Sequence, residues 1–185
     1  LGDSYVNTDY TFIDETDTVD RWRSFLGAHG RYRDSYDVVQ IADTRERRRI
    51  KGEYVLSPLD QLNRRTFPDT VVRAKSNFDS HGFTIHPVYF LEPPHKRDIY
   101  ANVPYRCLLP KGIDGMLVTG LGISAHRDAI PLVRMQPDAQ NQGYAAGVAA
   151  ALAAQEGGSV RRINVKQLQK HLVNKGNLPE DVLEA

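Results

Sequence analysis

The sequence predicts an α+β fold in which helices flank a mixed β-sheet, and two patterns carry this prediction. Short extended runs are more frequent in the early part of the chain, whereas the longest helical patterns lie in the late part. Hydrophobic residues make up 41% of the 185 residues and charged residues 25%, which is typical of globular proteins and excludes the disordered class. A chain of this length predicts a single domain over residues 1–185.

The first predicted elements are one strand and one helix. Segment 1–15 shows no helical period and predicts a strand at 10–13. After Thr18, the expected N-cap, the apolar residues Val19, Trp22 and Leu26 recur at helical spacing. This spacing predicts an amphipathic helix that stops at the glycines at positions 27 and 30.

The middle of the chain predicts several short strands, at 50–55, 71–72, 83–90, 100–109 and 116–119. Pro87 places the third of these at a sheet edge or a bulge, because proline cannot donate a hydrogen bond to a ladder. Ser57 and Pro58 open a short helix, with Ser57 as its N-cap. The last strand ends at Gly120, which suits a buried strand whose end leaves room for a ligand near the backbone.

Two helices close the chain. The pattern at 138–155 is the clearest, with Asp138 as the expected cap and a stripe of small residues formed by Gly143, Ala146, Gly147, Ala150 and Ala154. Such a stripe lets another backbone or a flat ligand come near. The final helix starts at Asn164 and ends near Gly176, and it is predicted to bury Val165, Leu168 and Leu172.

Charge and cysteine content exclude several kinds of site. The net charge of +1 provides no bulk attraction to nucleic acid or to an anionic membrane, so neither a nucleic-acid partner nor a membrane span is expected. Cys107 is the only cysteine, which rules out an intramolecular disulfide and a cysteine-based metal cluster, and no metal site is predicted. One cysteine suits a cytoplasmic or a periplasmic protein equally.

Residues 120–125 read Gly-Leu-Gly-Ile-Ser-Ala and match the dinucleotide-binding pattern G-x-G-x-x-A after a predicted strand. A true fingerprint opens a helix, and an acidic residue follows about 20 positions later at the end of the next strand. Pro131 interrupts any such helix, and no such strand follows. We therefore expect a strand end that approaches a ligand in another way.

A candidate for proton transfer follows this stretch. His126 comes directly after it and lies eight residues before Arg134, so an imidazole and a guanidinium share one loop ahead of a helix. His81 and His86 are five residues apart and point to opposite faces of a predicted strand, which is poor metal geometry. The basic run at 45–51 has acidic neighbours and predicts an ion-paired surface.

The start of the helix at 138–155 is a second candidate feature. Its unpaired N–H groups and partial positive charge attract electron-rich groups, and Gly143 lets a planar ligand such as an anionic reduced flavin approach. A small-residue helix packed tightly in a core explains the same residues equally well. Both interpretations remain open at this point.

A series of spaced blocks resembles the later half of the FAD-dependent oxidoreductases of the two-dinucleotide-binding-fold class. The resemblance covers about residues 45–175 and rests on GEYVL (52–56), PDTV (68–71), DSH (79–81), VPYRCLLP (103–110), DGMLVTG (114–120), ISAH (123–126), VRMQP (133–137) and QGYAAGVAAALA (142–153). It implies that the glycine-ended strand and the late helix pack against the flavin ring, with the cofactor-binding residues Gly120, Leu121, Met135, Gln142, Gly143 and Ala146.

The resemblance also implies catalytic roles. His126 is expected to be a proton donor or acceptor, and Arg134 or Arg106 to orient a polar or anionic small-molecule substrate. Leu121 departs from the family, which commonly has arginine at this position, so a cofactor or substrate contact through that side chain is not implied.

The amino-terminal G-x-G-x-x-G unit that holds the ADP half of FAD in the family has no counterpart in this sequence. We therefore expect an incomplete flavoprotein fold without its N-terminal Rossmann unit, beginning at a cut edge at Leu1. Its partner would be the missing FAD-binding domain, and the chain itself would bind FAD weakly or not at all. The alternative is a stand-alone, non-catalytic binding domain, in which the surface around Gly120, His126 and Gly143 would be buried by the chain itself.

Overall fold

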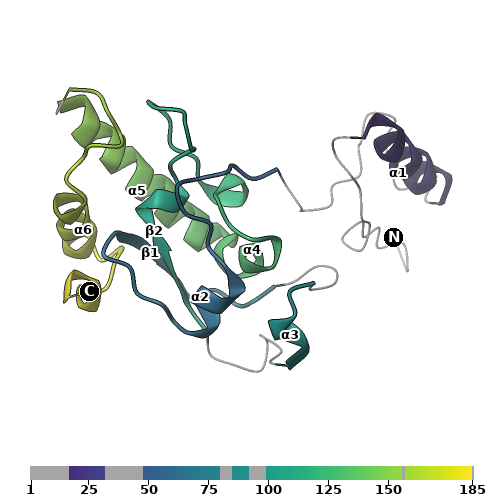
Figure 1. The fold of residues 1–185 in the computed structure, drawn as a ribbon, viewed down its shortest axis with the longest axis horizontal. Helices are drawn as coiled ribbons and strands as arrows, with labels where there is room; N and C mark the ends of the chain where they lie inside the picture. Colours follow the sequence, from purple (N-terminus) through teal and green to yellow (C-terminus); the bar gives the residue numbers. More distant parts are fainter. Residues whose placement is uncertain (1–16, 32–47, 80–84, 92–98, 156, 185) are drawn as a thin grey trace. The chain divides into compact units, whose positions relative to one another are not determined.

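The computed structural model describes residues 17–31, 48–79, 85–91, 99–155 and 157–184. Residues 17–31 and Arg48 belong to one compact unit, and the other described residues form a second, larger unit. The described elements are helices and one small antiparallel sheet, so the predicted α+β class is confirmed (Figure 1). None of the described helices is long and apolar enough to cross a membrane.

The first unit contains helix α1, Thr18–Arg31, as the periodicity predicts. Its cap is Asp17 rather than Thr18, because Asp17 Oδ1 accepts the Val19 N–H at 2.8 Å. The helix continues through both glycines that were expected to stop it. Its apolar residues Val19, Trp22 and Leu26 are each more than half exposed. The strand predicted at 10–13 lies outside the described residues.

The second unit is built around a two-stranded antiparallel sheet. Strand β1, Thr70–Ala74, pairs with strand β2, Ala101–Pro104, and Val72 lies opposite Val103. Almost every residue of the two strands is buried, which agrees with the predicted strands at 71–72 and within 100–109. The strand predicted at 100–109 is shorter than expected: it ends at Pro104, after which Tyr105–Cys107 forms a short 3-10 helix.

The sheet is smaller than the mixed sheet that the sequence predicts. Among the described residues, segment 50–55 contributes only an isolated bridge between Gly52 and Pro110, and a second bridge joins Leu56 to Ala125. Segment 116–119 forms no strand: Met116 is half exposed, and the one backbone bond to this segment runs from the Val118 N–H to a carbonyl at position 108. Neither segment pairs with a neighbouring strand in the part of the chain that the structure describes.

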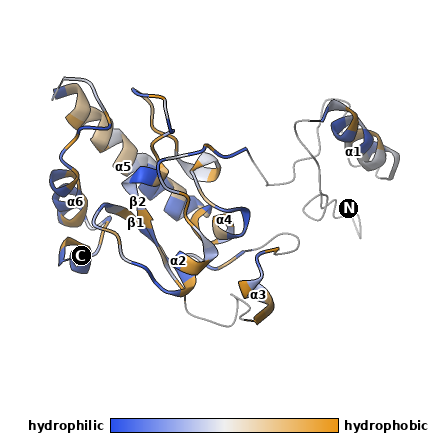
Figure 2. Cartoon of the chain, viewed as in Figure 1, coloured by the Kyte–Doolittle hydropathy of each residue, from blue (hydrophilic) through white to orange (hydrophobic). Residues whose placement is uncertain are grey.

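The run at 83–90 forms no strand where the structure describes it: residues 85–87 are irregular, and Val88–Leu91 forms helix α3. This corrects the predicted edge strand. The N–H groups of Ile85 and His86 are both taken by the carboxylate of Asp128, so neither is available to a sheet. Pro87 then lies directly before the helix. The ribbon of α3 is mostly orange in Figure 2, because valine, phenylalanine and leucine make up most of it.

Short helices surround the sheet. Helix α2, Pro58–Leu62, begins as predicted at Ser57, whose side chain forms a reciprocal capping box with Asp60. Helix α4, Ile130–Val133, is separated from the long helix α5 by Arg134 and Met135. The last helix, α6, runs over Val165–Asn174 with Asn164 as its N-cap, as the sequence predicts.

Helix α5, Gln136–Gln155, packs against β1 and α6 (Figure 1). Its inner face carries Ala145, Ala149 and Ala153, which are spaced by four residues and buried. The predicted stripe that contains Gly143 and Gly147 therefore lies on the other side, where both glycines are exposed. The core of this unit combines the alanines of α5 with large aliphatic residues of the sheet, the loops, α4 and α6, such as Leu56, Val72, Val103, Leu108, Ile123, Leu132, Leu168 and Leu172.

Candidate functional site

His126 is the N-cap of a short 3-10 helix, Arg127–Ala129. Its backbone N–H donates to the carbonyl of Leu56 at 2.7 Å, and its Nδ1 accepts the backbone N–H of Asp128 at 3.1 Å. Because a backbone N–H can only donate, Nδ1 carries no proton here and the neutral ring is protonated at Nε2. Within the described part of the chain, Nε2 has no hydrogen-bond partner.

Asp128 organises the residues around this histidine. Its Oδ2 accepts the backbone N–H groups of Ile85 at 2.7 Å and His86 at 2.6 Å, and its carbonyl accepts the Tyr89 hydroxyl at 3.4 Å. Its Oδ1 lies 3.8 Å from Nη1 of Arg127. The Asp128 side chain is 4% exposed, so these donors compensate a carboxylate that has left water.

These contacts bring a second imidazole to the site. The rings of His86 and His126 lie edge to face, with their centroids 5.3 Å apart and an interplanar angle of 88°. His86 Nδ1 accepts the backbone N–H of Val88 at 3.3 Å, so this ring, when neutral, also carries its proton on Nε2. The structure therefore places two histidines of the same tautomer side by side, 40 positions apart in the sequence.

The surroundings keep His126 neutral. Burial lowers the pKa of His126 below its ordinary value, and the positive charges of His86, Arg49 and Arg127 lower it further. The carboxylate of Asp128 acts in the opposite direction but does not outweigh burial. At neutral pH the group is therefore an uncharged imidazole that offers an Nε2–H donor.

Arg134 is held by Asp79. Its Nη2 donates to the carbonyl oxygen and to Oδ2 of Asp79, both at 2.9 Å, and its side chain is 12% exposed. Arg134 follows α4 directly, whereas Asp79 lies beyond β1. The guanidinium thus joins two segments that are distant in sequence.

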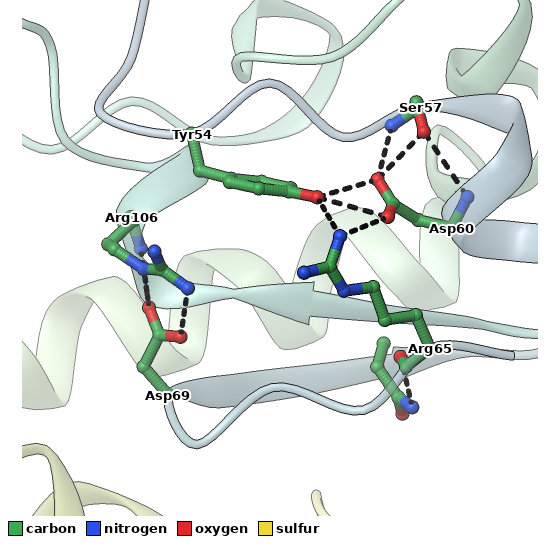
Figure 3. Close-up of polar contacts among 7 residues, drawn as sticks. Tyr54, Ser57, Asp60, Arg65, Asp69 and Arg106 are labelled. Atoms are coloured by element: carbon green, nitrogen blue, oxygen red, sulfur yellow. Dashed lines mark hydrogen bonds and ion pairs between the residues drawn. The ribbon is translucent and has the colours of Figure 1, made fainter.

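Arg106 has an equally well-defined partner, Asp69 (Figure 3). The two residues form parallel hydrogen bonds, and the guanidinium lies 5.3 Å from the centroid of the Tyr54 ring. The Tyr54 hydroxyl in turn contacts both carboxylate oxygens of Asp60, at 2.9 and 3.0 Å, and accepts from Arg65 at 3.1 Å. Burial, reinforced by Asp60, raises the pKa of Tyr54 to about 12.

The glycine-rich stretch forms a turn. Gly120–Gly122 is a 3-10 helix, Gly120 has φ +67°, and Ile123 returns to extended geometry, so no α-helix begins here. The Gly120 N–H donates to Gln142 Oε1 at 2.7 Å, and Gln142 Nε2 donates to the carbonyl of Val133 at 2.8 Å. Gln142 is fully buried, and Leu121 packs against the core. The amide of Gln142 thus ties the turn to the end of α4.

The outer face of α5 is open. A Cβ added at Gly143 or Gly147 would meet no atom within 4 Å, and Ala146 and Met135 are half-buried nearby in sequence. Asp138 lies in the first turn of the helix instead of capping it, and its Oδ1 accepts the backbone N–H of Lys75 at 3.3 Å. Burial raises the pKa of Asp138.

The surface that separates the two functional interpretations is not closed by the described chain. Gly120 and His126 are half-buried, and Gly143 is exposed. At Gly143, an added Cβ would meet no atom of the described residues within 4 Å, so the backbone there is not covered by a neighbouring side chain. A pyrophosphate does not fit the turn at 120–122 in the usual way, because no helix N-terminus opens there.

Sequence reasoning singled out Arg106, Arg134 and His126 but missed their partners. Each one is paired with a different aspartate: Asp69 for Arg106, Asp79 for Arg134 and Asp128 for the backbone turn of His126. Asp128 follows His126 by two residues, a spacing typical of a side chain that caps a turn, and this was the available signal. Of the other two histidines considered, His86 joins His126, and His81 lies outside the described residues.

Comparison with known proteins agrees with the resemblance. No curated protein and no solved structure has significant similarity to the chain. A family model described as FAD dependent oxidoreductase matches residues 18–172, which is most of the sequence. The chain therefore belongs to the FAD-dependent oxidoreductase family.

Proposed function

We propose that this chain forms the flavin-ring and substrate side of an FAD-dependent oxidoreductase, as one domain over residues 1–185. Family membership supports a redox role through FAD and a small-molecule substrate. The ADP half of FAD would be held by a Rossmann unit outside these residues. The support for this is that G-x-G-x-x-A occurs once in the sequence and forms a 3-10 turn there.

The flavin ring would lie on the open face of α5. Gly143 and Ala146 would permit its approach, and Gly120, Leu121, Met135 and Gln142 would shape the edge of the site, with Gln142 acting from within through the Gly120 backbone. Bound FAD would supply the chemistry, the acceptance of two electrons from the substrate. The start of α5 carries a partial positive charge, which suits electron-rich atoms.

The observation that carries the proposal is the state of His126. Its Nδ1 is occupied by the Asp128 N–H, so the neutral ring faces its ligand with Nε2–H. In this state His126 is a hydrogen-bond donor, not a base. Such a donor stabilises negative charge as it develops on a bound group, and it transfers its proton only when that charge is large.

The two arginine side chains would be held in fixed positions by their aspartate partners. Arg106 uses Nε and Nη2 on Asp69, and Arg134 uses Nη2 on Asp79. A guanidinium held in this way is preorganised, so any nitrogen turned toward a substrate would orient an anionic group without moving. Arg134 and Arg106 would therefore orient the substrate from fixed positions.

The proposal is tested by flavin reduction in protein that carries FAD. His126→Gln is expected to slow reduction by substrate about 100-fold, the lower range for loss of one proton-transfer or donor group, with the FAD content unchanged. His171→Gln is the matched control, because His171 bonds Tyr144 between α6 and α5 and is not part of this cluster. An unchanged reduction rate would overturn the role of His126, and loss of FAD would make it a cofactor-holding residue.

The alternative of a non-catalytic binding domain has its own outcome. In that case, FAD-containing protein would show no substrate-dependent reduction with any variant, wild type included. Titration of the chain alone with FAD is expected to show weak binding. A dissociation constant of about 1 μM or below, equal to about −8 kcal/mol, would contradict the need for a further FAD-binding unit.

A further inference from the structure

The cluster around His126 contains a residue with no assigned role, His86. Its ring lies edge to face with His126, and a single buried side chain, that of Asp128, fixes the backbone that carries it. Tyr89 completes the packing, since its ring is 6.3 Å from that of His86 and its hydroxyl reaches the Asp128 carbonyl. The segment at 85–89 is thus anchored to the 3-10 turn that begins at His126.

We propose that His86 and Asp128 are positioning residues for His126: Asp128 holds the second imidazole against the first, and the pair presents one neutral Nε2–H donor to an electron-rich ligand. This inference rests on the donor role proposed above. It names two further residues of the site and the chemistry of its ligand, an acceptor of a hydrogen bond from a neutral imidazole.

The geometry gives each residue a separate task. The Asp128 backbone N–H occupies Nδ1 of His126 and so selects the tautomer. The Asp128 carboxylate binds the N–H groups of Ile85 and His86, which sets the position of the His86 ring. The edge-to-face contact then restricts rotation of the His126 ring.

The charges around His126 act in opposite directions. His86, when protonated, opposes protonation of its neighbour, as do Arg49 and Arg127, whereas Asp128 favours it. Burial of the ring also opposes protonation of His126, and it is the largest contribution. Substitutions at 86 and at 128 are therefore expected to shift the His126 pKa in opposite directions.

The experiment is an NMR titration of the full chain with ¹⁵N-labelled histidine, with the His126 signals assigned from His126→Gln. The unsubstituted chain is expected to show His126 with Nδ1 unprotonated and Nε2 protonated at neutral pH. His86→Phe keeps an aromatic ring in place and removes a titrating charge, so it should raise the His126 pKa. Asp128→Asn keeps an oxygen acceptor and removes the negative charge, so it should lower the His126 pKa further.

A purely structural role gives a different pattern. If Asp128→Asn simply released segment 85–89, water would reach His126, and the His126 pKa would rise toward the ordinary value in this variant, where the proposal expects it to fall. That result overturns the proposal, as does a His126 ring protonated at Nδ1 or an unchanged pKa in His86→Phe. If Asp128→Asn does not fold, the tautomer and the His86→Phe shift decide the question.

His171→Asn serves as the control, and the His126 titration should be unaffected by it, because His171 bonds Tyr144 on α5. No flavin is present in these measurements. The positioning roles and the proposed function can therefore fail separately: expected pKa shifts together with unchanged flavin reduction in His126→Gln would reject only the function.

Discussion

Arg106 and Asp69 join the ends of the two strands through a bidentate pair, with Nε–Oδ2 and Nη2–Oδ1 distances of 2.9 and 3.0 Å. The same carboxylate accepts the backbone N–H of Arg106 at 3.2 Å. Asp69 directly precedes β1 and Arg106 comes soon after β2, so the pair closes the end of the sheet where the Thr70–Pro104 pairing is irregular.

Asp69→Asn is expected to lower the free energy of unfolding by about 1–2 kcal/mol. The substitution removes a charge-assisted bidentate contact, and the 44% exposure of Arg106 limits the loss through solvent screening. Urea denaturation would measure it, with the exposed Glu180→Gln as a control expected to change stability by less than about 0.5 kcal/mol. Equal values for the two variants would contradict a structural role for the pair.

Gln142→Met is expected to destabilise the protein by about 2 kcal/mol, although the side chains have similar volumes. It leaves the Gly120 N–H and the Val133 carbonyl without their partner in a buried place. Gln140→Met, at an exposed position of the same helix, should be nearly neutral. Thermal unfolding of both variants checks the difference. If Gln142→Met were as nearly neutral as Gln140→Met, the Gly120 N–H and the Val133 carbonyl would have found other hydrogen-bond partners.

Two glycine-to-alanine substitutions should have opposite signs. A Cβ at Gly52 would lie 2.6 Å from Ser124 Cβ and 3.1 Å from the Arg106 carbonyl, so Gly52→Ala should cost about 1–3 kcal/mol. Gly143→Ala meets no atom and lies inside an exposed helix face, so it should stabilise the protein by about 0.5–1 kcal/mol.

Gly143→Ala also tests the cofactor face. The added methyl group is expected to weaken flavin binding while the free energy of unfolding of the flavin-free chain rises. Binding titration and urea denaturation of the same preparation separate the two effects. Unchanged flavin affinity would remove Gly143 from the proposed ring contact.

The stability of the protein should depend on pH through His126. Its folded-state pKa lies below the unfolded value of about 6.5, so the unfolded state takes up the proton first as the pH falls. The contribution of neutral His126 to the free energy of unfolding is therefore complete above the unfolded-state pKa of about 6.5. It is lost as the pH falls through the folded-state pKa. His126→Asn keeps an acceptor for the Asp128 N–H and does not titrate.

Urea denaturation at about pH 8 and about pH 5 checks the sign. The wild-type chain should lose more stability than His126→Asn over this interval. Because groups remote from His126 titrate alike in both proteins, the difference between them reports His126 and the groups that it contacts. A parallel loss in both proteins would assign the pH dependence elsewhere.

Local signals in the sequence were sufficient for helices α2 and α6. Ser57 and Asn164 cap helices as predicted, because a side-chain oxygen can satisfy a nearby N–H without any distant partner. Two adjacent β-branched residues, Val71 and Val72, predicted the strand that forms β1. The same reasoning failed at 116–119 and 83–90, where apolar content suggested strands but no partner strand supplied hydrogen bonds.

Sequence patterns alone predicted the α+β class, helices such as α2 and α6, and the family. Only the tertiary structure decided that His86 lies against His126 and that Asp128 selects its tautomer. It also decided which side of α5 is buried. The physical reason is that capping and periodicity act over a few residues, whereas burial and the pairing of charges depend on segments brought together by folding.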